Sequence, residues 1–155
     1  MNFFISTTGT LIVCSPESFK DWEIEVASST ERGALKYHLF CGPKRDTSSQ
    51  ALRKHEVVIT TYRVVGSDWA KAKVLFGCNW TRIILDDGHE ILNFRTKQSK
   101  AVVSMTSWFR WIILGTRTEK NGAGLHSIFK FLKCQPFDNH ANWKKDLPVA
   151  ALHEQ

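Results

Sequence analysis

The sequence predicts an α/β domain of three layers, in which a mainly parallel sheet is covered by helices on both sides. Short apolar, β-branched runs alternate along the chain with amphipathic segments. Runs that are apolar on both faces suit strands buried on both sides, and repeated strand–helix alternation suits right-handed crossovers. The 155 residues are 43% apolar and 23% charged, which is typical of one globular domain and excludes a disordered chain or a fibre.

Five apolar runs are the expected strands. They comprise residues 10–14, 35–40, 57–60, 82–86 and 111–115. Each is short and rich in Val, Ile or Leu, as strands of a covered sheet are.

Helix signals lie between these runs. Residues 15–17 combine a capping serine, a first-turn proline and a first-turn acid, and Phe19, Trp22 and Val26 then share one face. Thr47 or Ser48 can cap a short helix that continues through Lys54.

Three more helices are expected in the second half. Thr96 can cap a helix that buries Ala101, Val102 and Met105. A second helix, which ends before Pro136, is indicated by the apolar stripe Leu125, Ile128, Phe129 and Leu132. A last helix begins near Asp138 and buries Trp143. Segments 41–49 and 63–79 are expected to be surface loops, and 148–155 a loosely ordered tail.

Charge and cysteine usage limit the function classes. Lys and Arg number 21 against 15 acidic residues, a net charge of +6 that is compatible with a polyanionic partner. No stretch approaches 18 apolar residues, so no membrane span is expected. The four cysteines form no CxxC pair, which disfavours a zinc ribbon and favours buried free thiols over disulfides.

The fourth run ends in Asp86-Asp87-Gly88-His89-Glu90, the richest chemical cluster in the chain. Ligands of an open parallel sheet bind beyond the carboxyl ends of its strands. One carboxylate there can hold a hydrated Mg²⁺ beside a nucleotide phosphate, and a second can take a proton from water. A polar turn in which Asp86 or Asp87 caps the next helix is the equally weighted alternative.

Other strand ends carry weaker signals. Gly115 and Thr116 follow the fifth run and can turn backbone N–H groups toward phosphate, although an ordinary turn is the favoured interpretation. Thr60, Thr61 and Tyr62 end the third run and can grip a nucleic-acid backbone, or simply be half-exposed strand residues.

The six tryptophans raise the possibility of base stacking. Trp22, Trp111 and Trp143, however, lie on faces that indicate core packing, which is the favoured interpretation.

Taken in order, five segments resemble the SNF2-type DNA-dependent ATPases. The segments are residues 10–22 (motif Ia), 56–62 (DVVITTY), 83–89 (ILDEGH, motif II), 110–116 (leading into motif III) and 130–143. The last segment, together with residues 37–46, resembles the transcription termination factor 2 and Lodestar branch of this family. The resemblance covers about residues 10–146.

The resemblance implies the first of two RecA-like lobes, which bind ATP and Mg²⁺ between them and couple hydrolysis to movement on double-stranded DNA. It implies that Asp86 holds Mg²⁺, that Asp87 acts as the base and that His89 couples the site to motif III. Gly115 and Thr116 would then lie near the nucleotide, and Thr60, Thr61 and Tyr62 near DNA. A nuclear location follows from the family alone.

Departures from the family pattern limit this expectation. No GxxxxGK[ST] loop occurs in the chain, so the P-loop strand and helix are expected to be lacking. Asp87 replaces a glutamate, Leu114 a threonine and Arg117 a proline. A carboxylate displaced by about 1 Å can cost about 100-fold in rate.

We therefore expect residues 1–147 to form a partial ATP-binding lobe, followed by a tail at 148–155. One hypothesis is a lobe relative that needs a P-loop from elsewhere and a second RecA-like lobe. The other is a non-enzymatic remnant or a module that binds DNA or protein.

Overall fold

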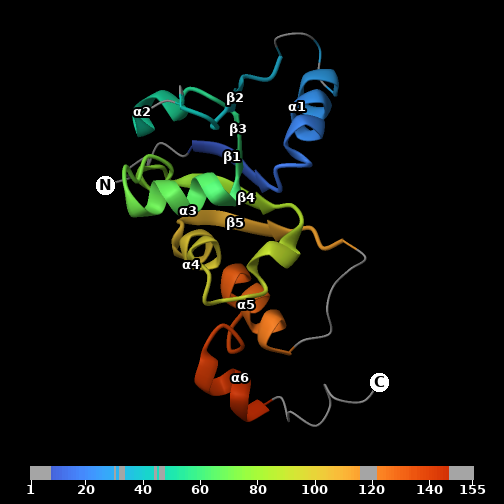
Figure 1. Ribbon diagram of the computed structural model, residues 1–155, viewed down its shortest axis with the longest axis vertical. Coiled ribbons are helices and arrows are strands. Elements are labelled where there is room, and N and C mark those ends of the chain that lie inside the picture. Colours follow the sequence, from blue (N-terminus) through green and yellow to red (C-terminus); the bar gives the residue numbers. More distant parts are fainter. Residues whose placement is uncertain are drawn as a thin grey trace, which may run out of the picture.

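The computed structural model describes residues 8–29, 31, 34–43, 45, 48–115 and 122–146. These residues form a five-stranded sheet of order β2-β3-β1-β4-β5 in which all neighbouring strands are parallel (Figure 1). The strands are β1 (Thr8–Cys14), β2 (Tyr37–Leu39), β3 (Val57–Thr61), β4 (Trp80–Leu85) and β5 (Ser107–Ile112). The predicted α/β class and parallel sheet are confirmed.

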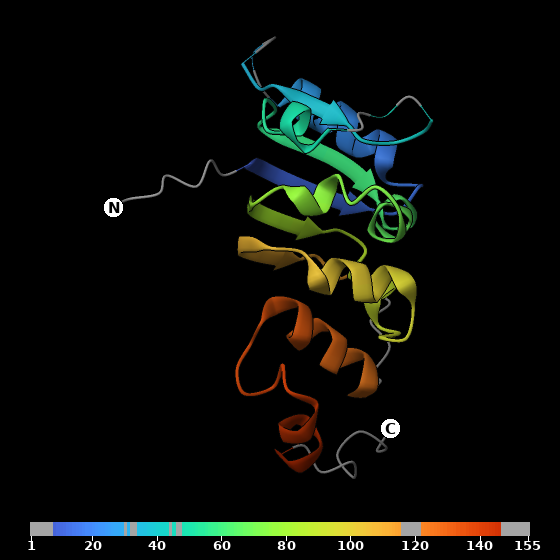
Figure 2. The same cartoon turned by 90° about the vertical axis from the view of Figure 1, so that its left-hand side faces the viewer.

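Helices cover both faces of the sheet, as predicted. In Figure 2, α3 (Tyr62–Ala70) and α4 (Lys97–Ser104) lie in front of the strands, and α1 (Phe19–Ser28) lies behind them. The short α2 (Ser49–Leu52) joins the front layer, whereas α5 (Gly122–Leu132) and α6 (His140–Asp146) lie beyond β5 in both views. Two 3-10 turns, η1 (Leu75–Gly77) and η2 (Gly88–Ile91), complete the described elements.

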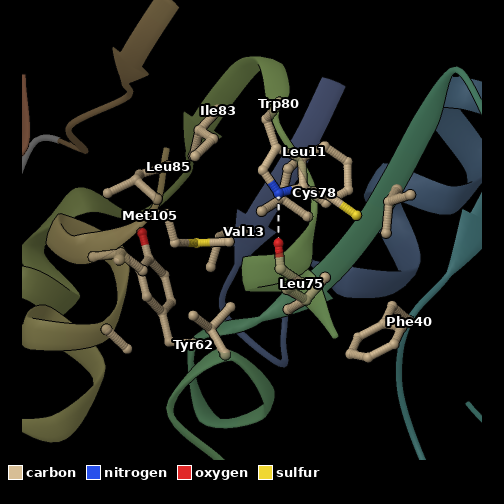
Figure 3. Packing of buried hydrophobic residues seen from close by; sticks show 14 of the residues in the cluster. Leu11, Val13, Phe40, Tyr62, Leu75, Cys78, Trp80, Ile83, Leu85 and Met105 are labelled. Carbon is tan, nitrogen blue, oxygen red and sulfur yellow. Dashed lines mark hydrogen bonds between the residues drawn. The ribbon is translucent and has the colours of Figure 1, made fainter. Parts of the chain in front are cut away.

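The larger core lies between the sheet and the α3–α4 layer. Trp80 is fully buried there, and its indole Nε1 donates a hydrogen bond to the Leu75 carbonyl at 3.0 Å (Figure 3). A smaller cluster lies under α1, where Val26 packs with Ile12, Cys14 and Ile59. The predicted apolar face of α1, with Phe19 and Trp22, contacts this second cluster.

The expectation of a loop over 63–79 is wrong for its first half, because α3 begins directly after β3. The Thr61 side chain accepts a hydrogen bond from the Val64 N–H at 3.4 Å and so caps the helix. Asp68 is buried, and its Oδ2 accepts from the Leu75 N–H at 2.9 Å. Gly66 and Asp68 interrupt the apolar spacing that would have indicated the helix.

The predicted caps are partly confirmed. Ser48 and Thr96 accept N-terminal N–H bonds of α2 and α4. Ser15 does not cap α1, which begins four residues later at Phe19; instead Ser15 Oγ accepts from the Ser18 N–H at 3.2 Å within the preceding turn.

The fifth strand differs from its prediction in place and in burial. It begins at Ser107 rather than at 111, because residues 107–110 also pair with β4 although Arg110 breaks the apolar run. Trp143 is buried as expected, but Trp111 is 56% exposed, so its assignment to the core is wrong. Trp108 is 70% exposed on the other face of the same strand.

The cysteines are free thiols, as predicted, but only two of them, Cys14 and Cys78, are buried; Cys41 and Cys134 are exposed. Among the helices of the described residues, none has the length and hydropathy of a membrane span.

Candidate functional site

The acidic cluster lies at the carboxyl edge of the sheet. Asp86 directly follows β4, and its N–H continues the sheet by donating to the Val13 carbonyl of β1 at 2.8 Å. The Tyr62 hydroxyl, at the start of α3, donates to the Asp86 carbonyl at 2.6 Å. Asp86 is thereby fixed where ligands of parallel sheets bind.

Both carboxylate oxygens of Asp86 accept hydrogen bonds. Oδ2 accepts from the indole Nε1–H of Trp22 in α1 at 2.7 Å, and Oδ1 accepts from the Asp87 N–H at 2.9 Å. Hydrogen bonds to an ionised acceptor are stronger than neutral ones. The half-buried carboxylate is therefore held in one orientation.

Asp87 has a left-handed backbone, with φ of 53° and ψ of 51°. Aspartate tolerates this region better than most side chains because its short polar group bonds locally. Its Oδ2 accepts from the Ser18 hydroxyl at 3.0 Å. Trp22 and Ser18 thus tie both carboxylates of the pair to the start of α1.

Gly88 lets the turn pack against the end of β5. Its N–H donates to the Ile113 carbonyl at 2.9 Å, and a Cβ at this position would lie 2.5 Å from Ile112 Cγ1. His89 follows in η2 with an exposed side chain. The turn therefore touches the end of β5 through Gly88, and the predicted coupling role of His89 stays a prediction.

The residues expected at DNA are buried in this structure. Thr60 is fully buried and its hydroxyl donates to the Phe40 carbonyl at 2.8 Å, Thr61 caps α3, and Tyr62 is 2% exposed. Each hydroxyl is used within the fold, so these three residues support the strand end. A direct DNA contact through them stays a prediction, and it would need surface that their side chains do not present here.

Burial dominates the protonation of two groups behind the acidic pair. It raises the pKa of the Cys14 thiol to about 12, and the charges of Asp86 and Asp87 add to the effect. Burial likewise raises the pKa of the Tyr62 hydroxyl far above its ordinary value, with Glu90 and Asp86 contributing. Tyr62 therefore remains a hydrogen-bond donor to Asp86.

A pocket of about 340 Å³ opens beside Asp86. Its lining residues are Ser18, Asp21, Trp22, Glu25 and Asp86. Three carboxylates and no basic side chain line this pocket. Such a lining attracts a cation and repels an unmetallated phosphate.

The remaining predicted site residue within the described part of the chain is Gly115. It is exposed, and a Cβ there would meet no atom within 4 Å. Thr116 lies outside the described residues.

Sequence reasoning missed the roles of Ser18 and Trp22. Trp22 was assigned to packing alone, although a half-buried indole N–H usually finds an acceptor. The need of the Trp22 indole N–H for an acceptor was therefore the signal that could have revealed its role. Nothing in the local sequence named Asp86 as the partner 64 residues away.

Comparison with known proteins identifies the family. Residues 4–155 match the SNF2-related domain. The chain is 36% identical over 137 residues to transcription termination factor 2 of Drosophila melanogaster, with 88% of this chain and 13% of that protein covered. It is 31% identical over 140 residues to the helicase-like transcription factor of Mus musculus, with 88% of this chain and 14% of that protein covered.

A solved structure with the same fold is the SWI2/SNF2 ATPase core of Sulfolobus solfataricus in complex with dsDNA. Its TM-score is 0.73 at 26% identity, and the match covers 90% of this chain and 28% of that one. The chain thus spans only a small part of the length of its relatives. The RecA-like character expected of the fold agrees with this neighbour, and the chain belongs to the SNF2-related domain family.

Proposed function

We propose that this chain supplies the motif II part of an ATP-dependent DNA translocase lobe and is not catalytic by itself. The observation that carries the proposal is the fixed acidic pair at the carboxyl edge of the sheet. Asp86 is anchored through its backbone to β1 and through its carboxylate to Trp22. Asp86 would hold Mg²⁺ through water, and Asp87 would act as a weak base toward water.

The chemistry of the acidic pair fits Mg²⁺. This ion keeps several waters and is usually held by one or two carboxylates together with substrate phosphates. Asp86 and Asp87 supply these carboxylates, and each oxygen that accepts one hydrogen bond keeps a second lone pair. The bound ion would supply charge neutralisation for the phosphates.

The fit to ATP itself is incomplete. No GxxxxGK[ST] loop occurs in the sequence, and the pocket beside Asp86 is lined by carboxylates. ATP affinity therefore requires a phosphate-binding loop in addition to the acidic pair. Gly115 and Thr116, predicted at the nucleotide, cannot replace a lysine.

We further propose double-stranded DNA and a second RecA-like lobe as partners, with a location in the nucleus. The net charge of +6 and the dsDNA bound by the archaeal neighbour support DNA as the partner. The names of the relatives refer to transcription and, for RAD5A of Arabidopsis thaliana, to DNA repair, which supports the nuclear location. Residues 1–147 would form the partial lobe, and 148–155 a tail.

A non-enzymatic remnant or binding module is the second candidate. The replacement of glutamate by Asp87 favours it, because the shorter side chain is held by Ser18 at 3.0 Å rather than presented to the open edge.

The deciding experiment measures Mg²⁺-dependent binding and turnover of ATP by the purified chain, with and without duplex DNA. We expect no turnover and, at most, millimolar binding that needs Mg²⁺ and is lost in Asp86→Ala. Glu31→Ala, which removes an exposed acid outside the pocket, is the control and should leave that binding unchanged. Micromolar binding or DNA-stimulated hydrolysis would overturn the claim of inactivity, and an equal loss of binding in Glu31→Ala and Asp86→Ala would overturn the role of Asp86.

A further inference from the structure

We propose that Ser18 and Trp22 are positioning residues that preset the acidic pair, Asp86 and Asp87, for Mg²⁺ and against Ca²⁺. The inference rests on the proposed function, because it concerns the same two carboxylates. It adds the residues that decide which ion these carboxylates accept. The observation behind it is that hydrogen bonds from the start of α1 fix both carboxylates.

The two donors lie one turn apart on α1. The Trp22 N–H donates to the Ser18 carbonyl at 3.0 Å, and residues four apart on a helix share one face. From this face the Trp22 indole N–H donates to Asp86 Oδ2 at 2.7 Å. The Ser18 hydroxyl donates to Asp87 Oδ2 at 3.0 Å. One helix therefore holds two successive carboxylates.

Ser15 sets the direction of the Ser18 hydroxyl. The Ser15 hydroxyl donates to Ser18 Oγ at 3.2 Å, and Ser15 Oγ accepts from the Ser18 N–H at 3.2 Å. Ser15 is 6% exposed, so little water reaches these bonds. Because Ser18 Oγ already accepts a hydrogen bond, its own proton turns toward Asp87, and successive bonds in such a chain strengthen one another.

The backbone of Asp86 is fixed as well. Its N–H donates to the Val13 carbonyl at 2.8 Å, and its carbonyl accepts from the Tyr62 hydroxyl at 2.6 Å. The side chain can still rotate, but the Trp22 indole at Oδ2 and the Asp87 N–H, 2.9 Å from Oδ1, restrain it. The carboxylate oxygens are therefore held in place before an ion binds.

A preset carboxylate favours Mg²⁺ over Ca²⁺. Mg²⁺ demands near-ideal octahedral geometry and keeps several waters, whereas Ca²⁺ takes more oxygens in flexible arrangements and often uses both oxygens of one carboxylate. Each Asp86 oxygen already accepts one hydrogen bond, which leaves less capacity for such a two-oxygen contact. Loss of the Trp22 donor should therefore weaken Mg²⁺ binding more than Ca²⁺ binding.

The test measures Mn²⁺ binding to the purified full chain by electron paramagnetic resonance, with Mg²⁺ and Ca²⁺ as competitors. Mn²⁺ is the probe because it takes oxygen ligands in octahedral geometry, as Mg²⁺ does. Trp22→Phe and Ser18→Ala should each weaken Mn²⁺ and Mg²⁺ binding about 10-fold, the low end for loss of a hydrogen-bond partner of a metal ligand. Ca²⁺ affinity should change less than about threefold, so the preference for Mg²⁺ over Ca²⁺ should fall.

Ser28→Ala and Trp108→Phe are the matched controls. Ser28 lies on the same helix, and its exposed hydroxyl donates to the Glu25 carbonyl; Trp108 is 70% exposed on β5. Each control should change the ion affinities less than about twofold. Ser18→Thr keeps the hydroxyl and should restore the binding that Ser18→Ala loses. Circular dichroism of each variant checks the fold.

A second measurement needs no change at Trp22. NMR of the isotope-labelled wild-type chain follows the Trp22 indole N–H, whose nitrogen lies 2.7 Å from Asp86 Oδ2. Mn²⁺ should broaden this signal before that of Trp108, and Mg²⁺ should shift it. Both effects should disappear in Asp86→Ala.

The outcomes separate this inference from the proposed function. Unchanged affinities in Trp22→Phe and Ser18→Ala, with loss of binding in Asp86→Ala, would overturn the inference and leave the proposed function standing. Equal losses of Mg²⁺ and Ca²⁺ affinity would overturn the claim that these residues choose the ion. A wild-type chain that binds no Mn²⁺ and shows no change of the Trp22 signal would overturn both proposals.

Discussion

The bond between Trp22 and Asp86 should stabilise the domain as well as orient the carboxylate. The perturbation is Trp22→Phe, which keeps an aromatic ring and removes the Nε1–H that donates to Asp86 Oδ2 at 2.7 Å. Asp86→Ala removes the acceptor. Together the two changes define a double-mutant cycle that isolates the bond from the packing of each side chain.

The structure sets the magnitude of the coupling energy. Hydrogen bonds to charged groups contribute about 1.5–3 kcal/mol when well buried. Trp22 and Asp86 are only half-buried and line an open pocket, so water can solvate the Asp86 carboxylate once the indole N–H has been removed. We therefore expect a coupling energy of about 1–1.5 kcal/mol, which is below the range for well-buried bonds.

Urea unfolding followed by circular dichroism measures the cycle without relying on the altered fluorophore. Trp108→Phe, at a 70% exposed position, is the control and should change the free energy of unfolding by less than about 0.5 kcal/mol. A coupling energy below about 0.3 kcal/mol, the scatter of independent sites, would refute the idea that this bond joins α1 to the acidic turn.

Three further predictions concern thiols, acid and a glycine. A thiol reagent should modify two cysteines in the folded chain and four after unfolding, because Cys14 and Cys78 are buried and burial raises the pKa of Cys14 to about 12; rapid modification of a third would contradict this. Burial, with nearby His140, lowers the pKa of His126 below 6.5 in the folded chain. As the pH falls, His126 is therefore protonated at a higher pH in the unfolded chain than in the folded one. The free energy of unfolding should accordingly fall as pH drops below about 6.5, and His126→Gln should flatten that dependence. Gly9→Ala should destabilise the sheet by more than about 2 kcal/mol, since its Cβ would lie 2.0 Å from the Glu56 carbonyl oxygen, whereas Gly115→Ala, with open space, should be neutral in the same thermal melt.

The strands of the sheet were predictable because each buried strand is a run of consecutive apolar residues. The runs around Ile12, Ile59 and Ile83 are apolar whatever the rest of the chain does, and all three lie in buried strands. The α3 helix was not predictable in the same way. Its start depends on Thr61 leaving a strand directly into a helix, and its apolar spacing is interrupted by Asp68, whose partner is the backbone of Leu75.

The candidate site was likewise predictable where it depends on local sequence and not where it depends on tertiary packing. The place of Asp86 and Asp87 followed from local order alone, since a polar cluster after a buried strand must lie at the carboxyl edge. Their hydrogen-bond partners did not, because Ser18 and Trp22 reach them only once α1 has packed behind the sheet. The burial of Thr60 was missed for the converse reason: a hydroxyl suggests an exposed position, but this one donates to the Phe40 carbonyl inside the fold.

Trp111 shows why periodicity alone cannot assign burial at the end of a sheet. The same alternation that buries Ile12 on β1 leaves Trp111 exposed on β5, because α1 packs over β1 and β3 and no described helix of that layer continues to β5. Burial of a strand face depends on a neighbour that the strand does not encode. Arg82 shields part of this surface, because its guanidinium carbon lies 5.4 Å from the centre of the Trp111 ring.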